Sequence, residues 1–356
     1  MQITAIEVEP LELKLQTALT VAYGSYPELN YALLKIITDD GLLGLGEASP
    51  DPEVTGETQA AVIAALQQAA TFLVGSNPFD IEQIINQCLD HIPAFPAAIA
   101  AVDMALYDLV GQSLEVPVYQ LLGGKSRSGI GLYPVIPMDD PQTMAALSRK
   151  FVDLGVDRLK IKLGSDPDAD LQRLKNIQDT VGNSVKLRLD INQGWKDSRT
   201  AIEIIQQLSD FNIEWIEQPV GDSDLDELAA VTAAVDIPIM ADESCHGPAD
   251  VLAIACCEAA DLINIKLMKC GGLYQATKTL AVAEAAGLPC ILGSMGESSI
   301  GSAAGLHFMT AKPGIIACEL IGPLFIENDP ATGYQVDMAT FQAIPSIQPG
   351  LGVQLI

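Results

Sequence analysis

Acidic and basic residues recur at regular intervals in the middle of the chain, each closing a short apolar segment of strand type. The acids are Asp190 after KLRL, Glu217 after IEWI and Asp242 after IPIMA, and the lysines are Lys160 and Lys162 in LKIK and Lys266 after INI. From Lys162 to Lys266 the successive gaps are 28, 27, 25 and 24 residues, close to the length of one strand–helix unit. If each segment is a parallel strand of one barrel, all these side chains lie at its mouth, where barrel active sites are found.

Three carboxylates in one barrel mouth would repel one another and raise their own pKa values unless a cation joined them. An all-oxygen site with open positions suits Mg²⁺, which keeps water molecules and takes substrate oxygens. We therefore predict that Asp190, Glu217 and Asp242 bind Mg²⁺. Asn192, on the same face as Asp190, is expected to support them. The alternative is that three of the 46 acidic residues stand at strand ends by chance and are only solvated.

The lysines would flank this cation from two sides. Lys160 and Lys162 are two residues apart on one strand, so both face the same side, and Lys266 comes from the sixth strand, across the mouth from the second. This layout suits removal of a proton from carbon on one face and its return on the other, with Mg²⁺ holding the substrate carboxylate and stabilising an enediolate. A neighbouring cation and partial burial are expected to lower a lysine pKa and make it a usable base. The alternative is that the lysines only neutralise the acids.

A strand–helix alternation from about residue 129 predicts the fold that positions these side chains. We expect strands at 130–136, 158–162, 186–190, 213–217, 237–242, 262–266, 289–293 and 315–320. Eight such units, with no GxGxxG after the first strand, favour an α/β fold with a (β/α)₈, TIM-like barrel over an open doubly wound sheet.

The first third of the chain has a different, α+β pattern. Strands are expected at 3–15, 31–37 and 42–48, and helices at 57–73, 80–90 and 96–113. The segment 17–28 has no clear period and is expected to be a loop that covers the barrel mouth as a lid. We predict an α+β capping domain over residues 1–125 with this lid, a barrel over 126–322, and a C-terminal segment, 323–356, that returns to the capping domain.

Composition excludes some partners. The chain has 19 basic and 46 acidic residues, and the resulting charge of −27 excludes a nucleic-acid backbone and disfavours anionic membranes. Its seven cysteines have no framework spacing, and MQITAIEVEP lacks the basic region of a signal peptide, so we expect a cytoplasmic protein. No segment predicts a membrane span. Assembly into a homo-oligomer is a further expectation, without a specific interface signal.

Taken together, the motifs resemble the enolase superfamily, and within it the muconate-lactonising-enzyme subgroup. That subgroup has Lys-x-Lys on the second strand, seen here as KIK, then Asp, Glu and Asp ligands, seen here in DINQGW, IEQP and MADES, and a lysine on the sixth strand, seen here in NIKLMKCGG. The resemblance covers essentially the whole chain. It implies a capped barrel, a Mg²⁺ site and the lysine-base, enediolate chemistry for which that superfamily is a standard example.

Within the subgroup, DINQGW, NIKLMKCGG and GSMGES most resemble dipeptide epimerases, which invert the α-carbon of the C-terminal residue. By that resemblance Lys162 and Lys266 are the two acid/base catalysts, and Lys160 polarises the substrate carboxylate. The loop formed by Ser294, Met295 and Gly296 would help to hold the dipeptide.

One position departs from the dipeptide epimerases, which carry Asp-x-Asp on the eighth strand to bind the substrate ammonium group. Here the run is Glu319-Leu320-Ile321, in which Glu319 can pair with an ammonium and Ile321 replaces the second acid. Muconate lactonising enzymes have a similar Glu-Leu-aromatic-Gly-Pro run. A muconate cycloisomerase, or a lyase such as o-succinylbenzoate synthase, is therefore the rival function. A non-catalytic binding barrel is disfavoured because no ligand or base position is substituted.

The predicted lid informs side-chain preference. Ala-Glu epimerases place a basic residue there to meet the glutamate side chain, whereas residues 17–28 contain no Lys or Arg but do contain Tyr23 and Tyr26. We therefore expect a dipeptide with a hydrophobic or aromatic side chain, with Tyr23 among the residues that contact it.

Overall fold

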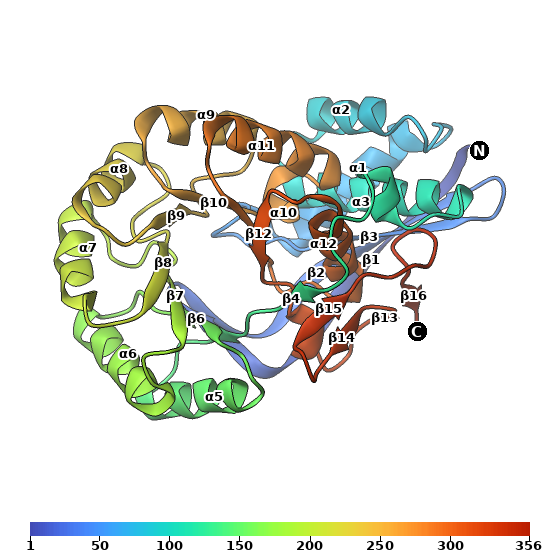
Figure 1. Cartoon of the computed structure of the whole chain (residues 1–356). Helices are drawn as coiled ribbons and strands as arrows, with labels where there is room; N and C mark the ends of the chain where they lie inside the picture. Colours follow the sequence, from blue (N-terminus) through green and yellow to red (C-terminus); the bar gives the residue numbers. More distant parts are fainter.

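A three-stranded antiparallel sheet begins the chain in the computed structural model, which describes all 356 residues. Its order is β1 (Ile3–Val21), β2 (Gly24–Thr38) and β3 (Leu43–Ala48). Four helices follow: α1 (Gln59–Leu73), α2 (Ile81–His91), α3 (Pro96–Ser113) and α4 (Val118–Leu121). Figure 1 shows this unit at the right of the molecule, beside the N-terminus.

Helix α3 lies directly on strand β3 because two glycines in that strand leave room for it. A Cβ on Gly46 would lie 2.0 Å from the carbonyl oxygen of Ala101, and a Cβ on Gly44 would lie 2.4 Å from that of Ala105. Any side chain at either glycine would push the helix away from the sheet. This contact joins the sheet and its helices into one apolar core.

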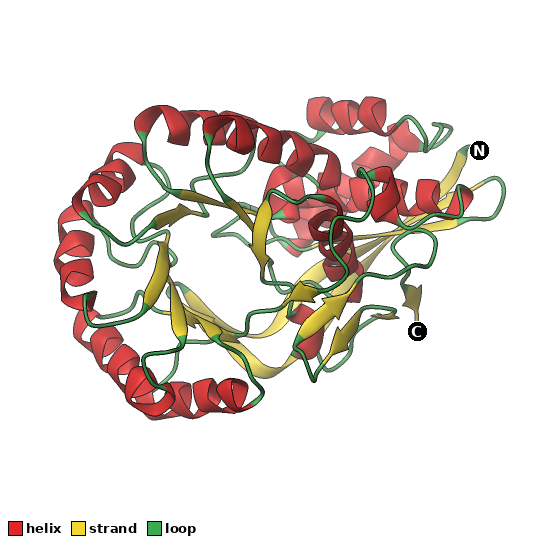
Figure 2. Ribbon diagram, viewed as in Figure 1, coloured by secondary structure: helices red, strands yellow, loops and turns green.

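Eight parallel strands then form the barrel, as expected from the sequence. They are β5 (Val135–Ile136), β6 (Arg158–Lys162), β7 (Lys186–Asp190), β8 (Ile213–Glu217), β9 (Ile239–Ala241), β10 (Leu262–Ile265), β11 (Cys290–Leu292) and β12 (Ile315–Cys318). A parallel bridge between Leu132 and Cys318 joins β12 to the chain just before β5. Figure 2 shows the strands as an inner ring inside an outer ring of helices.

Seven helices of eight residues or more follow the first seven barrel strands. They are α5 (Pro141–Asp153), α6 (Pro167–Val181), α7 (Ser198–Ile205), α8 (Leu225–Ala234), α9 (Pro248–Cys257), α11 (Leu273–Ala286) and α12 (Ser299–Ala311), with the short α10 (Leu267–Cys270) ahead of α11 and a 3₁₀ turn at Gln206–Leu208 after α7. No α-helix follows β12, where the chain forms a 3₁₀ turn, Gly322–Leu324, and then short strands. The eighth strand–helix unit is therefore incomplete.

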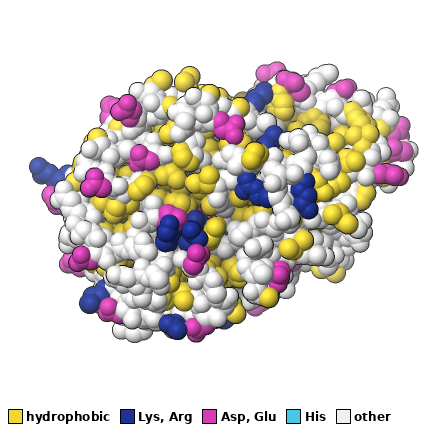
Figure 3. All heavy atoms as spheres, in the orientation of Figure 1, with side chains coloured by type: hydrophobic (Ala, Val, Ile, Leu, Met, Phe, Trp, Pro, Cys, Tyr) yellow, Lys and Arg dark blue, Asp and Glu magenta, His cyan; other side chains and the backbone are white.

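Aspartates begin four successive barrel helices and account for part of the acidic composition. The side chains of Asp140, Asp166, Asp197 and Asp224 accept hydrogen bonds from backbone N–H groups in the first turns of α5, α6, α7 and α8. Each carboxylate satisfies free amides and interacts favourably with the helix dipole. On the face shown in Figure 3, most acidic side chains are scattered around the outline instead of gathering in one patch.

The segment 17–28 is ordered differently from the expected loop. It forms the far ends of β1 and β2, which pair again from Leu19 opposite Tyr26 to Val21 opposite Gly24 after a break in register beyond Lys14. The break removes the alternation of apolar and polar residues on which strand prediction depends, so the hairpin could not be predicted from the sequence. The hairpin end reaches the barrel, where the N–H of Met138 donates to the carbonyl of Thr20 at 2.9 Å.

The C-terminal residues contact the N-terminal unit. The N–H of Gln16 donates to the carbonyl of Phe325 and that of Glu327 to the carbonyl of Lys14, both at 2.9 Å. Farther along, the N–H of Leu351 donates to Asp108 on α3 at 2.8 Å. Short strands occur in this segment: β13 (Ala331–Thr332), β14 (Gln335–Asp337), β15 (Gln342–Ile344), which pairs with β4 (Ile130–Gly131), and β16 (Gln354–Leu355). The division at residues 125 and 322 stays a prediction.

Candidate active site

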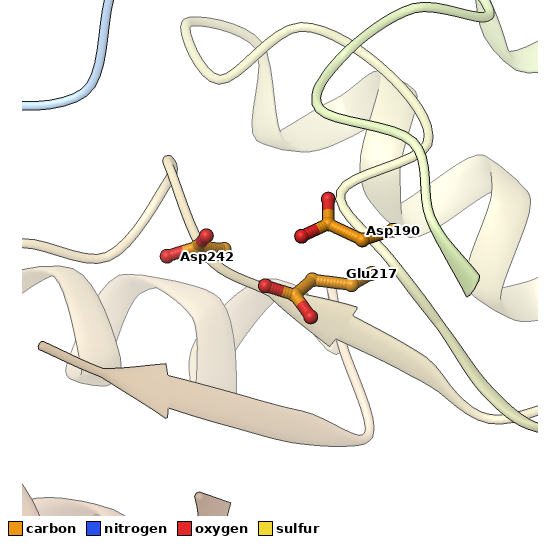
Figure 4. A group of neighbouring side chains, drawn as sticks. All are labelled: Asp190, Glu217 and Asp242. Carbon is orange, nitrogen blue, oxygen red and sulfur yellow. The ribbon is translucent and has the colours of Figure 1, made fainter. Parts of the chain in front are cut away.

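The three predicted metal ligands converge. Asp190 ends β7, Glu217 ends β8 and Asp242 follows β9, and one oxygen from each lies within 4.8 Å of the others. Figure 4 shows the three carboxyl groups directed toward one region. The parallel register explains this, because Asp190 pairs with Glu217 across the sheet and Glu217 pairs with Met240, two residues before Asp242. All three side chains are fully buried.

Two of the predicted lysines approach this group from opposite sides. The Nζ of Lys162 lies 2.7 Å from Oδ2 of Asp190, and the Nζ of Lys266 lies 2.7 Å from Oδ2 of Asp242. Lys162 ends β6 and Lys266 follows β10, and these strands are four positions apart in the eight-stranded ring. A flat group held against the acids would therefore meet one ammonium on each face.

The third predicted lysine lies deeper, among acids. The Nζ of Lys160 is 2.8 Å from carboxylate oxygens of Asp190, Glu217 and Glu319, and its side chain is only 2% exposed. Glu319 was expected to meet a substrate ammonium, but in this arrangement its Oε2 accepts a hydrogen bond from Lys160. Its other oxygen, Oε1, has no partner within the chain.

Charge and burial compete at the three acids. Burial opposes ionisation of Asp190, but Lys160 and Lys162 outweigh it and hold the pKa of Asp190 at about 2. Asp242 behaves similarly, since Lys266 and Lys269 outweigh burial and hold its pKa well below the usual value. At Glu217, burial and the charge of Asp190 prevail, so its pKa is raised well above its ordinary value. The lysines thus compensate Asp190 and Asp242 but not Glu217.

The expectation of a lowered lysine pKa is wrong for this arrangement of charges. Burial does disfavour the ammonium form of Lys266, but the carboxylates of Asp242 and Glu243 outweigh burial and raise its pKa. The same competition, with Asp190 and Glu217 as the main partners, raises the pKa of Lys160 well above its ordinary value. Sequence spacing located the acids but did not show that each lysine would contact one directly.

The acid triad fits a divalent cation. Glu217 Oε2 and Asp242 Oδ2 lie 2.8 and 2.7 Å from the ammonium nitrogens of Lys160 and Lys266, but neither oxygen accepts a hydrogen bond of acceptable geometry. These two buried oxygens therefore have unused acceptor capacity, and carboxylate oxygens are the ligands that Mg²⁺ prefers. Asp190, Glu217 and Asp242 are the residues that could hold it.

Two residues that the sequence analysis did not select form hydrogen bonds with the predicted metal ligands. Lys269 is fully buried and donates to Oδ1 of Asp242 at 2.5 Å. Asn264 donates to Oε1 of Glu217 at 2.8 Å. Lys269 follows Lys266 by one helical turn in NIKLMKCGG, and this i, i+3 spacing was the available signal.

Asn192 has the supporting position that was predicted for it. Its backbone N–H donates to Oδ1 of Asp190, its side-chain oxygen accepts from Lys162 at 2.9 Å, and its amide donates to Glu243 at 2.9 Å. Its φ of +44° lies in the left-handed region, which asparagine tolerates better than most residues. Asn192 thereby links the lysine to two acids. Glu243 was not selected from the sequence.

A cavity of about 440 Å³ is lined by the three lysines that contact the acids. The residues predicted to act on or bind the substrate all line it: Lys160, Lys162, Lys266, Tyr23, Ser294, Met295, Gly296, Glu319 and Ile321. Asn192, predicted to support the metal ligands, lines it as well. The hairpin end adds Leu19, Val21 and Tyr26. The cavity therefore has charged side chains on one wall and a largely apolar covering.

The loop at Ser294–Gly296 is fixed from two directions. Tyr31 of β2 donates its hydroxyl to the carbonyl of Met295 at 2.5 Å. Glu47, fully buried at the end of β3, accepts from the N–H groups of Ser298 and Gly301 at the start of α12, at 3.0 and 3.1 Å. The N-terminal unit thus positions a barrel loop that lines the cavity, a connection that the sequence did not indicate.

Comparisons with known proteins agree with the motifs. The family described as "Mandelate racemase / muconate lactonizing enzyme, N-terminal domain" matches residues 3–123, and "Enolase C-terminal domain-like" matches residues 143–356. No helix of the structure has the length and hydrophobicity to cross a membrane.

Two curated relatives and one solved structure illustrate the similarity. The chain is 38% identical to an N-succinyl-L-Arg/Lys racemase of Bacillus cereus, over 100% of this chain and 96% of the relative. It is 41% identical to a hydrophobic dipeptide epimerase of Enterococcus faecalis, over 94% of each. A crystal structure of dipeptide epimerase from Enterococcus faecalis, in complex with Mg and L-Leu-L-Tyr, matches with a TM-score of 0.95 and 39% identity, covering 99% of this chain and 100% of that one.

Proposed function

Because the chain belongs to the mandelate racemase and muconate lactonizing enzyme family of the enolase superfamily, we propose that it is a Mg²⁺-dependent dipeptide epimerase. The observation that carries this proposal is the pair of lysines, Lys162 and Lys266, on opposite sides of the acid triad. Proton transfer at one carbon with inversion requires a group on each face. The relatives named as dipeptide epimerases support the same substrate class.

Asp190, Glu217 and Asp242 would hold the Mg²⁺. When bound, the cation supplies the positive charge that attracts the substrate carboxylate and favours the enediolate form of the substrate. Lys160, buried beside two of these ligands, adds a further ammonium toward the same carboxylate. Asn264 and Lys269 keep two ligands oriented through their second oxygens.

Lys162 and Lys266 perform the proton transfer. One lysine takes the α-proton of the C-terminal residue as the free amine, a form that a Mg²⁺ beside the acids would favour by offsetting their charge. The other lysine, as the ammonium, returns a proton to the opposite face. The reverse reaction exchanges the two roles. The hydrogen bond from Lys162 to Asn192, at 2.9 Å, orients that lysine toward the cavity.

The covering of the cavity supports a hydrophobic or aromatic side chain on the dipeptide. Tyr23, Leu19, Val21 and Ile321 line it, and the hairpin carries no basic side chain between residues 17 and 28. Tyr23 and Tyr26 contact each other edge to face, with ring centroids 6.3 Å apart. An apolar side chain would gain by leaving water against these groups.

A second candidate is racemisation of N-acylated amino acids, which share the carboxylate and the α-proton but lack the ammonium. The contact of Glu319 with Lys160 favours it, because Oε2 of Glu319 is engaged within the chain and Ile321 offers no second acid. The similarity to the N-succinyl-L-Arg/Lys racemase also favours this second candidate. A muconate cycloisomerase or an o-succinylbenzoate synthase-like lyase needs only one working lysine and is the weaker rival.

We also propose a cytoplasmic location, since all seven cysteines are free. Homo-oligomerisation stays a prediction.

Incubation of the protein with Mg²⁺ and a dipeptide library in D₂O tests the proposed function. Dipeptides with hydrophobic or aromatic C-terminal residues should exchange their α-proton and yield both stereoisomers, as followed by NMR. A preference for L-Ala-L-Glu over L-Ala-L-Phe and L-Ala-L-Tyr would contradict the side-chain assignment. Turnover of N-succinylamino acids alone would favour the second candidate, and turnover of muconate alone would favour a cycloisomerase.

A further inference from the structure

A dipeptide brings a positive charge to this cavity that the eighth strand does not match. Oε2 of Glu319 is engaged by Lys160 at 2.8 Å, and Ile321 offers no charge. A cationic nitrogen placed there would lose its hydration and meet only a carboxylate that already contacts the ammonium of Lys160. This inference rests on the proposed function and concerns which other residue supplies that charge.

Four acidic residues line the cavity, and three of them are already engaged or exposed to solvent. Glu319 pairs with Lys160. Glu57 accepts from the N–H of Ala97 at 3.1 Å, at the start of α3. Glu28 is exposed on β2, opposite Lys14 in the strand register. Asp51 alone lines the cavity half-buried without a cation beside it.

The turn that follows β3 fixes the carboxylate of Asp51. Its backbone carbonyl accepts from Val54, Thr55 and Gly56 at 3.2, 2.8 and 3.1 Å. Its Oδ1 accepts from the N–H of Glu53 at 2.8 Å, whereas Oδ2 accepts no hydrogen bond within the chain. One oxygen therefore anchors the side chain, and the other is available to a ligand.

The field of Asp51 reaches the residues that surround the substrate position. Burial and, next, the charge of Asp51 raise the pKa of Tyr23, to which Asp190 also contributes. Asp51 likewise contributes to the raised pKa of Tyr31, whose hydroxyl contacts Met295. Asp51, Tyr23 and Tyr31 all line the same cavity, so the charge of Asp51 acts where the substrate would lie.

We propose that Asp51 binds a positively charged nitrogen of the substrate through Oδ2. Two parts of a dipeptide could supply it: the free ammonium of the N-terminal residue, or the ammonium of a basic side chain. Both would form a charge-assisted hydrogen bond with the same oxygen. No cation of the chain competes for it.

The test compares three substrates with wild-type protein and the Asp51→Asn variant. L-Ala-L-Phe carries only the ammonium, N-acetyl-L-Ala-L-Lys carries only a cationic side chain, and N-acetyl-L-Ala-L-Phe carries neither. KM is measured by α-proton exchange, or Ki against L-Ala-L-Phe where a compound is not turned over. Asparagine keeps the acceptor for Glu53, so the turn should persist. Glu53→Gln, on the same turn but outside the cavity lining, is the matched control.

Asp51→Asn should raise the constant for a cation-bearing compound by about tenfold or more, the equivalent of a hydrogen bond to a charged group. The constant for N-acetyl-L-Ala-L-Phe should stay the same, and Glu53→Gln should change none. A selective loss on L-Ala-L-Phe identifies the N-terminal ammonium, and one on N-acetyl-L-Ala-L-Lys identifies the side chain. Equal effects on all three compounds, or none, would overturn the proposal. Absence of exchange with the wild-type protein would instead refute the proposed function.

Discussion

Two regions of the site are built in different ways. The charged floor consists of Lys162 and Lys266, which line the cavity, and of Asp190, Glu217 and Asp242, which lie against these lysines. The apolar cover consists of Leu19, Val21, Tyr23 and Tyr26. The floor acids are fully buried at the ends of adjacent barrel strands and are held by ion pairs of 2.7–2.8 Å. The cover residues lie on a hairpin end and are only partly buried, apart from Val21. Changes in the floor should therefore abolish chemistry, whereas changes in the cover should alter which substrate is preferred.

Removal of the metal should have the largest effect. EDTA should lower α-proton exchange by at least about a thousandfold, because several kcal/mol of charge stabilisation is lost. Added Mg²⁺ should restore it. Glu217→Gln should show the same loss without restoration at ordinary Mg²⁺ concentrations, whereas Glu203→Gln, an exposed acid on α7, should behave like the wild type. Activity that resists EDTA would contradict the assignment of the floor.

Lys269→Met should destabilise the floor most strongly. Removal of this fully buried ammonium leaves Asp242 with a less compensated charge, a change that typically costs about 3–5 kcal/mol. Lys175→Met is the matched control, because Lys175 pairs with Asp179 at the surface with 65% of its side chain exposed. Its loss should cost about 0.5 kcal/mol or less. Urea unfolding of both variants measures the difference, and equal costs would show that burial does not distinguish the two pairs.

The floor could be predicted from the sequence because a barrel places one strand end every 24 to 28 residues. Asp190, Glu217 and Asp242 each close an apolar strand, so their convergence follows from the topology. Lys269 and Asn264 were missed because neither closes a strand, and their importance depends on which oxygen they contact.

The cover was harder to predict. The break in register after Lys14 gave the segment 17–28 the appearance of a loop, although it is a hairpin. The contact of Glu47 with Ser298 joins residues 251 positions apart, and no local pattern indicates it. The raised pKa of Lys266 likewise depends on a direct contact with Asp242 that spacing does not specify.

Asp103 tests the junction between the N-terminal unit and the barrel. It lies on α3 and accepts hydrogen bonds from the N–H groups of Leu273 and Tyr274 at the start of α11. Burial raises its pKa from 3.8 to about 8. The folded protein therefore binds more protons than the unfolded chain between about pH 4 and 8, so stability should fall as pH rises through this window.

Asp103→Asn should reduce that fall by at least about 1 kcal/mol, close to the equivalent of one pKa unit. Urea unfolding near pH 5 and pH 9 gives the free energy of unfolding of each protein. The two proteins should be equally stable near pH 5, and the variant should be the more stable one near pH 9. If Asp103→Asn lowered the free energy of unfolding by the same amount at every pH, Asp103 would be ionised in the folded protein, and its raised pKa would be contradicted.

Tyr23→Ala should give the smallest effect and one confined to the cover. Loss of the ring should raise KM for L-Ala-L-Phe about fivefold, the equivalent of about 1 kcal/mol of aromatic contact, with little change for L-Ala-L-Ala. Tyr23→Phe keeps the ring and should behave like the wild type. A similar loss for both dipeptides would place Tyr23 in the chemistry of the floor instead of in selectivity.

The central claim is that Lys162 and Lys266 act on opposite faces of one carbon. Its most direct test measures α-proton exchange in D₂O for the L,L and L,D forms of one dipeptide with Lys162→Ala and Lys266→Ala. Each variant should lose exchange of one stereoisomer and keep measurable exchange of the other, with the losses reversed between the variants. If either variant retains full exchange of both forms, or if both variants lose the same form, the two-lysine account is wrong.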